Sequence, residues 1–177
     1  MKVKELRPLF TAEAIAARVR ELAVRIDALY GDEPLVVVCV LKGGALFFAD
    51  LVRCLRKPHV EMDFVRLSSY GMGDASSRDV VLGKDVELSL ADKHVLVVED
   101  IVDSGHSMHF LLRQLRQRGV RSLRLAVLVD KHERREVPVE ADFVGFSLSE
   151  GFIVGYGLDY AEQYRNLPGV YEVIGAE

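Results

Sequence analysis

The amino-acid sequence predicts an α/β fold with a central parallel β-sheet flanked by helices. Three short runs, residues 35–40, 95–98 and 123–129, are almost wholly apolar and rich in β-branched side chains. Such runs are typical of strands that are buried on both faces of a sheet. Helical patterns alternate with these runs along the chain, and this alternation is typical of parallel sheets that carry helices on both faces.

Composition and charge narrow the class of protein. The chain has 177 residues, of which 50% are hydrophobic, so we expect one domain, residues 1–177, with a sizeable core. The net charge is −4, so no overall basic field points to nucleic acid. The longest apolar run, residues 35–41, is too short to span a membrane, and the first residues lack the apolar segment of a signal peptide. We therefore expect a cytoplasmic protein.

Three helices are predicted. Thr11 is a favoured N-cap residue, and Gly31 suits the end of the first helix. Between them, apolar side chains follow helical spacing at Ile15, Val19, Leu22, Ile26 and Leu29. The second helix extends from Ala45 to about Leu55, and the third contains Leu111, Leu112 and Leu115 and stops at Gly119.

The other predicted strands are shorter or less regular. Residues 59–67 alternate apolar and polar side chains, which predicts a half-buried strand with Val60, Met62 and Phe64 on its apolar face. Residues 68–79 are small, polar and glycine-containing, and a loop of this length in a compact domain is either disordered or a lid. Further short strands are expected at residues 80–82 and 86–88, which would form a hairpin arm, and at residues 142–146 and 152–156.

The most informative stretch is residues 95–107. Its apolar strand ends in Glu99 and Asp100, Asp103 follows, and a loop of small residues opens a helix. Ligands bind at the carboxyl ends of parallel strands, and the amides and hydroxyls of such a loop suit a phosphate at a helix N-terminus. A solvated acidic turn explains the two adjacent acids alone. The whole run predicts a ligand with a phosphate at one end and hydroxyls or a metal ion, which the acids would face, at the other.

Charged side chains also follow two other predicted strands, at Lys42 and at Lys131. The carboxyl ends of parallel strands meet at one edge of a sheet, so we expect these lysines and the acids Glu99 and Asp100 to converge there.

Residues 95–107 resemble the phosphoribosyl-pyrophosphate signature of the type I phosphoribosyltransferases. In that signature an apolar strand is followed by Glu-Asp, two apolar residues, Asp, Thr or Ser, Gly, any residue, and Thr or Ser. Ser104 and Ser107 replace the commoner threonines, and His106 occupies a position that the family varies. The resemblance implies the type I phosphoribosyltransferase fold, a central parallel sheet flanked by helices with a small hood or hairpin and a mobile active-site loop.

The resemblance implies a phosphate-binding role for the loop. The backbone of residues 103–107 would cradle the 5′-phosphate of the ribose, together with the hydroxyls of Ser104 and Ser107. Gly105 and His106 would contribute main-chain contacts. Neutral donors at a helix N-terminus can bind a phosphate without a lysine.

The same resemblance assigns roles to the three acids. Glu99 and Asp100 would face the ribose hydroxyls, either directly or through Mg²⁺. Asp103 would be the general base that takes or shares the proton on N7 of a purine as N9 attacks the sugar. Its alternative role is to cap the helix that follows.

Two further segments match the family. Lys42, Gly43 and Gly44 lie where the family carries its pyrophosphate-binding loop, often with a non-proline cis peptide before the lysine. In isolation, a plain turn from strand to helix explains these residues as well. Ser69 and Tyr70 match a dipeptide of the mobile loop, whose closure would keep water from the cationic sugar.

The C-terminal part of the chain is similar to the purine-binding half of the hypoxanthine-guanine phosphoribosyltransferases at residues 128–131, 142–146, 152–160 and 164–165. By this match Lys131 contacts the 6-oxo group, Phe152 stacks on the purine ring, and Ile153 offers backbone groups to the edge of the base. Asp159 would bind a second Mg²⁺, and Arg165 would reach the pyrophosphate.

These resemblances imply a purine salvage transferase. It would convert hypoxanthine, and guanine, with 5-phosphoribosyl 1-pyrophosphate and Mg²⁺ into IMP, or GMP, and pyrophosphate. A lysine ammonium has three donors and no acceptor, so Lys131 suits a 6-oxo purine and leaves the 6-amino group of adenine unmatched. The family further implies a homodimer or homotetramer.

Two alternatives stay open. One is a transferase that prefers another purine, xanthine above all. The other is an RNA-binding regulator built on the same fold, which would need a basic surface. A local basic cluster does occur at Arg113, Arg116, Arg118, Arg121 and Arg124, although a solvated helix face explains it more simply.

Overall fold

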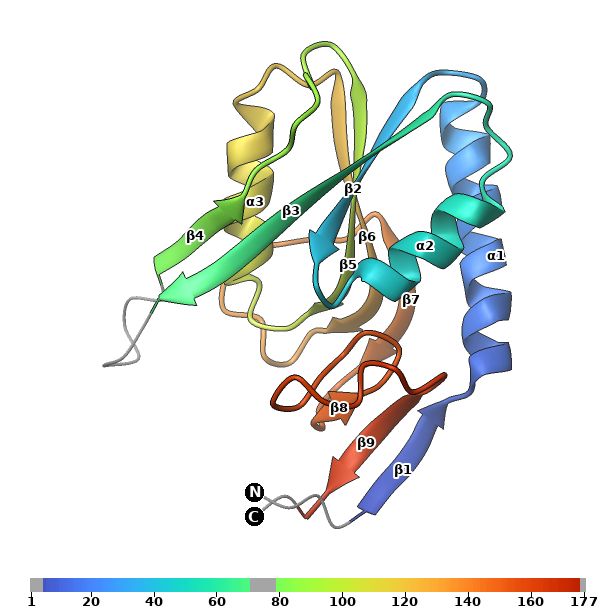
Figure 1. Ribbon diagram of the computed structural model, residues 1–177, viewed down its shortest axis with the longest axis vertical. Coiled ribbons are helices and arrows are strands. Elements are labelled where there is room, and N and C mark those ends of the chain that lie inside the picture. Colours follow the sequence, from blue (N-terminus) through green and yellow to red (C-terminus); the bar gives the residue numbers. More distant parts are fainter. Residues whose placement is uncertain (1–4, 71–78, 176–177) are drawn as a thin grey trace.

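The computed structural model describes residues 5–70 and 79–175, and its main sheet is the predicted one (Figure 1). The strands lie in the order β4 (Asp79–Lys84), β3 (Val60–Tyr70), β2 (Leu35–Leu41), β5 (His94–Val102), β6 (Ser122–Lys131) and β7 (Phe143–Leu148). Neighbouring strands are parallel, except that β4 is antiparallel to β3. The predicted α/β architecture is therefore confirmed.

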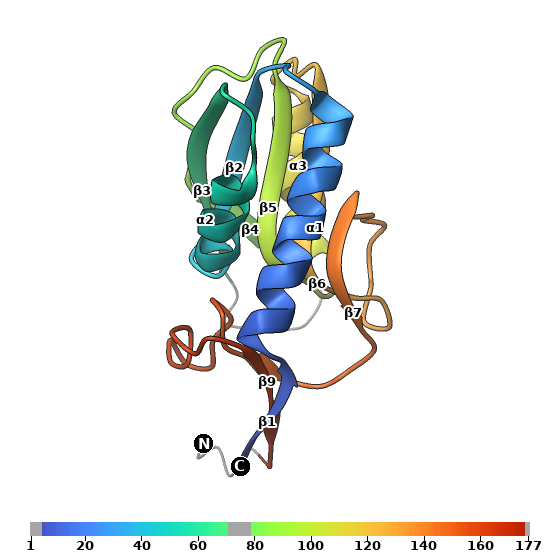
Figure 2. The ribbon, with the colours of Figure 1, turned by 90° about the vertical axis from the view of Figure 1, so that its right-hand side faces the viewer.

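Helices cover both faces of this sheet (Figure 2). On one face α1 (Ala12–Tyr30) and α2 (Ala45–Cys54) pack against the β2 side chains of Val37 and Cys39. On the other face α3 (His106–Arg116) packs against Val36 and Val38. Successive side chains of a strand point to opposite faces, so the continuous apolar run of β2 fills two cores at once.

Helix α1 begins and ends where the sequence predicts. The Thr11 hydroxyl accepts a hydrogen bond from the Ala14 amide at 3.2 Å, and Gly31 follows the helix with a φ of 50°. The prediction for Leu29 was wrong, because this side chain is 48% exposed while Tyr30 is buried. Tyr30 lies four residues after the buried Ile26, so it continues the apolar stripe on the same helix face. Among the helices of the described residues, none is long and apolar enough to cross a membrane.

A second, three-stranded antiparallel sheet lies beyond the carboxyl ends of β2, β5 and β6 (Figure 1). It consists of β1 (Glu5–Phe10), β9 (Val170–Ile174) and β8 (Ile153–Val154). We call it the hood. The strand predicted at residues 152–156 is β8, which is shorter than expected, whereas β1 and β9 were not predicted.

The arm next to the predicted loop also differs from expectation. Strand β3 continues to Tyr70 and pairs there with Asp79 of β4, so the arm is the β3–β4 hairpin. Residues 86–88 are not a strand. Residues 71–78, the middle of the predicted mobile loop, lie outside the described part of the chain.

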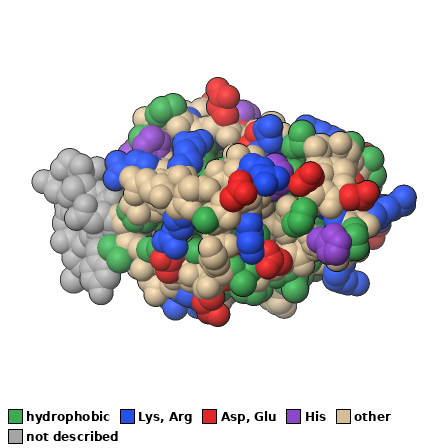
Figure 3. All heavy atoms as spheres, turned by 90° about the horizontal axis from the view of Figure 1, so that it is seen from above, with side chains coloured by type: hydrophobic (Ala, Val, Ile, Leu, Met, Phe, Trp, Pro, Cys, Tyr) green, Lys and Arg blue, Asp and Glu red, His purple; other side chains and the backbone are tan. Residues whose placement is uncertain are grey.

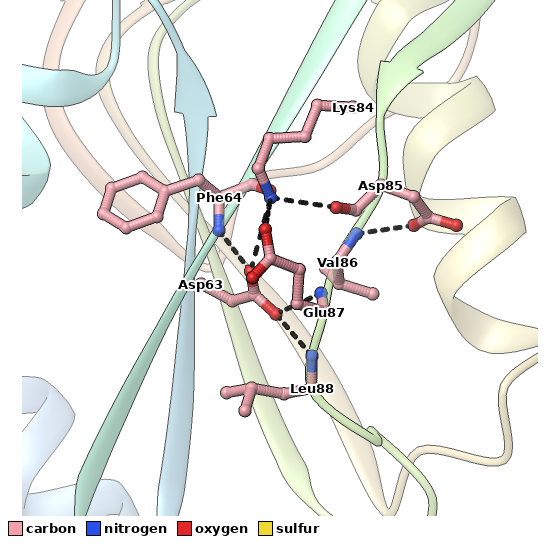
Figure 4. A network of polar contacts seen from close by, with 7 residues as sticks. All are labelled: Asp63, Phe64, Lys84, Asp85, Val86, Glu87 and Leu88. Carbon is pink, nitrogen blue, oxygen red and sulfur yellow. Dashed lines mark hydrogen bonds and ion pairs between the residues drawn. The ribbon is translucent and has the colours of Figure 1, made fainter.

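At Met62 and Asp63 the burial of β3 is the reverse of the predicted alternation. Met62 is 55% exposed, whereas Asp63 is buried. The Asp63 carboxylate accepts hydrogen bonds from the amides of Glu87 and Leu88 at 2.7 and 2.8 Å (Figure 4). The ammonium of Lys84 lies 3.9 Å away. Because this carboxylate takes up the amides of Glu87 and Leu88, that segment is held beside β3 without forming a strand.

We predict that Asp63→Ala lowers the free energy of unfolding by about 2–3 kcal/mol, because the amides of Phe64, Glu87 and Leu88 lose an acceptor. Urea denaturation followed by circular dichroism measures this quantity. The matched control is Glu61→Ala on the same strand, whose exposed ion pair with Lys93 should contribute less than about 1 kcal/mol. Equal losses in the two variants would contradict the assigned role of Asp63.

Candidate active site

The order of the strands places a ligand-binding position between β2 and β5. The chain continues from β2 to β3 on one side, and from β5 to β6 and β7 on the other. In α/β sheets, ligands bind outside the carboxyl ends of the strands at such a switch point. Lys42, the acids Glu99 and Asp100, and Lys131 all lie at this edge, as the sequence predicts.

The predicted phosphate loop surrounds a cavity of about 280 Å³. The cavity is lined by Glu99, Asp100, Ile101, Val102, Asp103, Ser104, Gly105, Ser107 and Met108. Gly105 has a φ of 91°, a conformation that L side chains rarely adopt, and α3 begins directly after it. The site thus has hydroxyls and free helix-end amides around one small cavity. His106 points elsewhere, and its Nε2 lies 2.7 Å from the Glu136 carboxylate.

A second cavity, of about 250 Å³, adjoins the first. It is lined by Asp100, Ile101, Asp103, Lys131, Arg134, Phe152, Ile153, Leu158 and Asp159. Both cavities share Asp100, Ile101 and Asp103. The structure therefore brings the predicted purine-binding residues to the same edge as the predicted general base.

Lys131 lies deep in the second cavity and is 3% exposed. Its ammonium donates a hydrogen bond to the Gly151 carbonyl at 2.6 Å. Burial lowers the pKa of this lysine, while the negative charge of Asp103 acts in the opposite direction. Phe152 is 48% exposed, and its ring meets Tyr160 edge-on at 5.4 Å between centroids. An exposed aromatic ring at a cavity wall suits the stacking of a flat ligand.

Glu99 and Asp100 form a buried acidic pair. Burial and the neighbouring Asp100 charge raise the pKa of Glu99 well above its ordinary value, and burial raises the pKa of Asp100. Gly43 lies tight against this pair, since a Cβ there would come within 1.7 Å of an Asp100 carboxylate oxygen. Nearby hydrogen bonds and charges do not fully offset the cost of burying these carboxylates in their ionised forms. A hard divalent cation such as Mg²⁺, which prefers carboxylate oxygens, would offset that cost.

The metal prediction involves Glu99, Asp100 and Asp159. Within residues 5–70 and 79–175, no group of three or more acidic, histidine or cysteine side chains could hold a metal ion by itself. The structure therefore does not bring Glu99, Asp100 and Asp159 together as one such group, and the metal assignment stays a prediction.

Two cations of the site share one carboxylate. Leu41 and Lys42 are joined by a non-proline cis peptide, as the family resemblance predicts. The Lys42 ammonium lies 2.8 Å from the Glu162 carboxylate, and Arg165 Nη2 lies 3.3 Å from the same group. Arg165 also contacts Asp159 at 2.7 Å. The sequence analysis did not single out Glu162; its only signal there was an acidic residue between Asp159 and Arg165.

Asp103 does not cap helix α3. The residue before the helix is Gly105, and no side chain makes a capping hydrogen bond there. Oxygen Oδ1 of Asp103 is buried without a hydrogen-bond partner, and Oδ2 lies 3.5 Å from Arg134. The alternative role of Asp103 is therefore wrong. Asp103 lines both cavities, and its Oδ1 is closed off from solvent without a hydrogen-bond partner among the described residues. Ser69 and Tyr70 lie at the end of β3, and their side chains are outside the described part of the structure.

Three of the five arginines in the basic cluster near α3 and β6 are paired with carboxylates. Arg118 lies 2.6 Å from Asp85, and Arg121 lies 3.2 Å from Asp92. Arg124 pairs with Asp142. When the molecule of Figure 1 is seen from above, basic and acidic side chains are interspersed on the surface in view (Figure 3). These pairs weaken the interpretation of the arginines as a nucleic-acid surface.

Comparison with known proteins agrees with this geometry. The phosphoribosyl transferase domain family matches residues 8–161. A hypoxanthine-guanine phosphoribosyltransferase of Aquifex aeolicus is 44% identical over 171 residues, 96% of each chain. A hypoxanthine phosphoribosyltransferase of Salmonella typhimurium is 45% identical over 162 residues, 90% of each chain.

Solved structures show the same likeness. The crystal structure of a hypoxanthine-guanine phosphoribosyltransferase from Bacillus anthracis is 41% identical and has a TM-score of 0.89. The match covers 98% of this chain and 100% of the other. The chain therefore belongs to the phosphoribosyltransferase family, and within it to the hypoxanthine-guanine phosphoribosyltransferases.

Proposed function

We propose that the chain transfers the 5-phosphoribosyl group of 5-phosphoribosyl 1-pyrophosphate to N9 of hypoxanthine, and of guanine, in purine salvage. The bond between C1′ of the ribose and the pyrophosphate breaks, the bond from C1′ to N9 forms, and the N7 proton leaves the base. The observation that carries this proposal is the junction of the two cavities at Asp103, with Lys131 in one and the phosphate loop in the other.

The phosphate loop binds the 5′-phosphate. The backbone amides of residues 103–107 and the hydroxyls of Ser104 and Ser107 are its donors, and the N-terminal end of α3 favours negative charge there. Gly105 allows the turn that brings these groups around one cavity.

The acids hold the sugar and the metal ion. Glu99 and Asp100 face the ribose hydroxyls, directly or through Mg²⁺, and Asp159 holds a second Mg²⁺. When bound, Mg²⁺ neutralises charge that develops on the departing pyrophosphate. The raised pKa values of Glu99 and Asp100 support this assignment, because a nearby cation would favour their ionised forms.

Cations at the opposite wall bind the leaving group. Lys42, the amides of Gly43 and Gly44, and Arg165 surround the pyrophosphate. Glu162 lies within ion-pair distance of both Lys42 and Arg165, so the pyrophosphate must displace this carboxylate to reach them.

The purine lies in the second cavity. Phe152 stacks on its ring, Ile153 contacts its edge through backbone groups, and Lys131 donates to its 6-oxo oxygen. Asp103 accepts the N7 proton as general base, and its position on the lining of both cavities supports this role. Positioning and charge stabilisation contribute the larger part of the rate.

We further propose that residues 1–177 act as one cytoplasmic domain, that it assembles as a homodimer or homotetramer, and that the loop containing Ser69 and Tyr70 closes over the sugar. Family membership supports these proposals.

A coupled assay on hypoxanthine, guanine, xanthine and adenine tests the function. We expect hypoxanthine and guanine to be converted, and adenine to have a kcat/KM lower by at least about 100-fold, because Lys131 has no acceptor for an amino group. Chelation of Mg²⁺ should abolish turnover, and added Mg²⁺ should restore it. A preference for adenine or xanthine would contradict the proposal.

Asp103→Asn should lower kcat by about 100-fold, the usual size of a general-base contribution, with little change in the KM for phosphoribosyl pyrophosphate. Steady-state kinetics separates the two parameters. Asp92→Asn, which changes an exposed carboxylate paired with Arg121, is the matched control and should leave both unchanged. An equal effect on kcat and on substrate binding would make Asp103 a ligand-holding residue instead.

Glu162→Gln should make pyrophosphate a tighter product inhibitor by about 3- to 10-fold, since two exposed ion pairs no longer compete with it. The inhibition constant of pyrophosphate measures the effect, and the effect should shrink at high salt. Glu21→Gln, which breaks an exposed pair with Arg18 on α1, is the control. An unchanged inhibition constant would show that Glu162 does not compete for Lys42 and Arg165.

A further inference from the structure

The segment after β6, residues 132–139, packs against the phosphate loop. The amides of Glu136 and Val137 donate hydrogen bonds to the Ser104 carbonyl at 2.9 and 3.3 Å. A Cβ on Gly105 would come within 3.0 Å of the Arg135 side chain and 3.1 Å of Val137. The loop is thus supported along its outer side by a segment that the sequence analysis did not single out.

Arg135 is the most connected side chain of this segment. Its Nε donates to the Asp103 carbonyl at 3.0 Å, and its Nη2 lies 3.4 Å from the Val102 carbonyl. The same guanidinium contacts the Asp130 carboxylate and the carbonyls of Val139 and Lys131. The Arg135 side chain is 16% exposed and that of Asp130 is 4% exposed. Asp130 neutralises the buried charge, so the guanidinium adds little net charge beside the phosphate cavity.

Arg135 and the amides after it bind three consecutive carbonyls, those of Val102, Asp103 and Ser104. The only cis peptide in the described residues joins Leu41 and Lys42, so these three peptide bonds are trans. In a trans peptide the N–H group points away from the carbonyl. The amides of Asp103, Ser104 and Gly105 are therefore directed away from Arg135, and these residues line the phosphate cavity.

The amides of Asp103, Ser104 and Gly105 make no hydrogen bond to any residue that the structure describes. Backbone donors are rarely left without a partner, so three adjacent free amides indicate a site for an anion. The parallel pairing of β5 with β6 extends only to Val102 and Asp130. Beyond that point a side chain must fix the orientation of the loop, and a planar group with five donors can bind several carbonyls at once.

We propose that Arg135 is a positioning residue for the 5′-phosphate, which holds the peptide units of Asp103 and Ser104 with their amides directed at the phosphate. Arg135 itself does not touch the substrate. This inference rests on the proposed function, since it assigns the free amides to the phosphate of the phosphoribosyl group.

Comparison of a nucleotide with its nucleoside isolates the contribution of the phosphate. Dissociation constants for IMP and inosine are measured by calorimetry or competition, for the wild type and for Arg135→Lys. A lysine at this position can keep the ion pair with Asp130. It lacks the planar guanidinium, so it cannot bind the carbonyls of Val102 and Asp103 at the same time. We expect IMP to bind about 10-fold more weakly to Arg135→Lys, while inosine binding stays the same, because hydrogen bonds to a charged group lose their alignment.

Arg124→Lys is the matched control. It makes the same substitution on β6, at an arginine paired with Asp142 and remote from both cavities, and should leave both constants unchanged. Unchanged IMP binding in Arg135→Lys, or an equal loss for IMP and inosine, would overturn the inference. A wild-type protein that binds IMP no better than inosine would instead contradict the proposed function.

Chemical rescue gives a second measurement. Arg135→Ala leaves space for a free guanidinium ion, and low millimolar guanidinium should restore IMP binding several-fold where ammonium does not. Guanidinium weakens a fold that is merely destabilised, so recovery of binding separates positioning from general stability. If folded Arg135→Ala shows no recovery, Arg135 does not act through its guanidinium; if this variant does not fold, Arg135→Lys decides alone.

Discussion

Unpaired backbone amides at the end of β5 are the constraint on which this structure depends. Where the hydrogen-bonded pairing of the strands stops, the backbone amides of the loop must be free to bind a ligand. The carbonyls of the same peptide units must stay hydrogen-bonded to the protein. The segment after β6 binds those carbonyls, and α3 adds the favourable potential of its N-terminal end. The apolar burial of β2, β5 and β6 on both faces then keeps this arrangement rigid.

Charge balance is the second feature of the site. Lys42 and Arg165 already have carboxylate partners, Glu162 and Asp159 respectively, whereas the Lys131 ammonium binds the Gly151 carbonyl. The buried pair Glu99–Asp100 is the opposite case, because burial raises the pKa of both carboxyl groups and so disfavours their ionised forms. In the proposed function, an anionic substrate would therefore replace Glu162 and Asp159 as the partner of Lys42 and Arg165, and a divalent cation would favour the ionised forms of Glu99 and Asp100.

The sequence predicted those parts whose function is encoded in a contiguous stretch. Strands buried on both faces are identified by their apolar runs, and the phosphate loop by thirteen adjacent residues. Strands β1 and β9 escaped prediction because they are short, partly exposed and paired across almost the whole chain. The same reason applies to Asp63, Glu162 and Arg135. Their partners lie in other segments, so no local pattern distinguishes them from ordinary surface charges.

The pairing of β9 with both β1 and β8 has a consequence for biosynthesis. Strand β8 carries Ile153 and follows Phe152, so the wall proposed to face the base depends on β9, which the ribosome makes after β8. More than fifty residues separate β9 from the end of α3, and β2, β5 and the phosphate loop lie earlier still in the chain. The segment from β2 to α3 is therefore made well before β9, and the wall proposed to face the base can form only once β9 has joined β8.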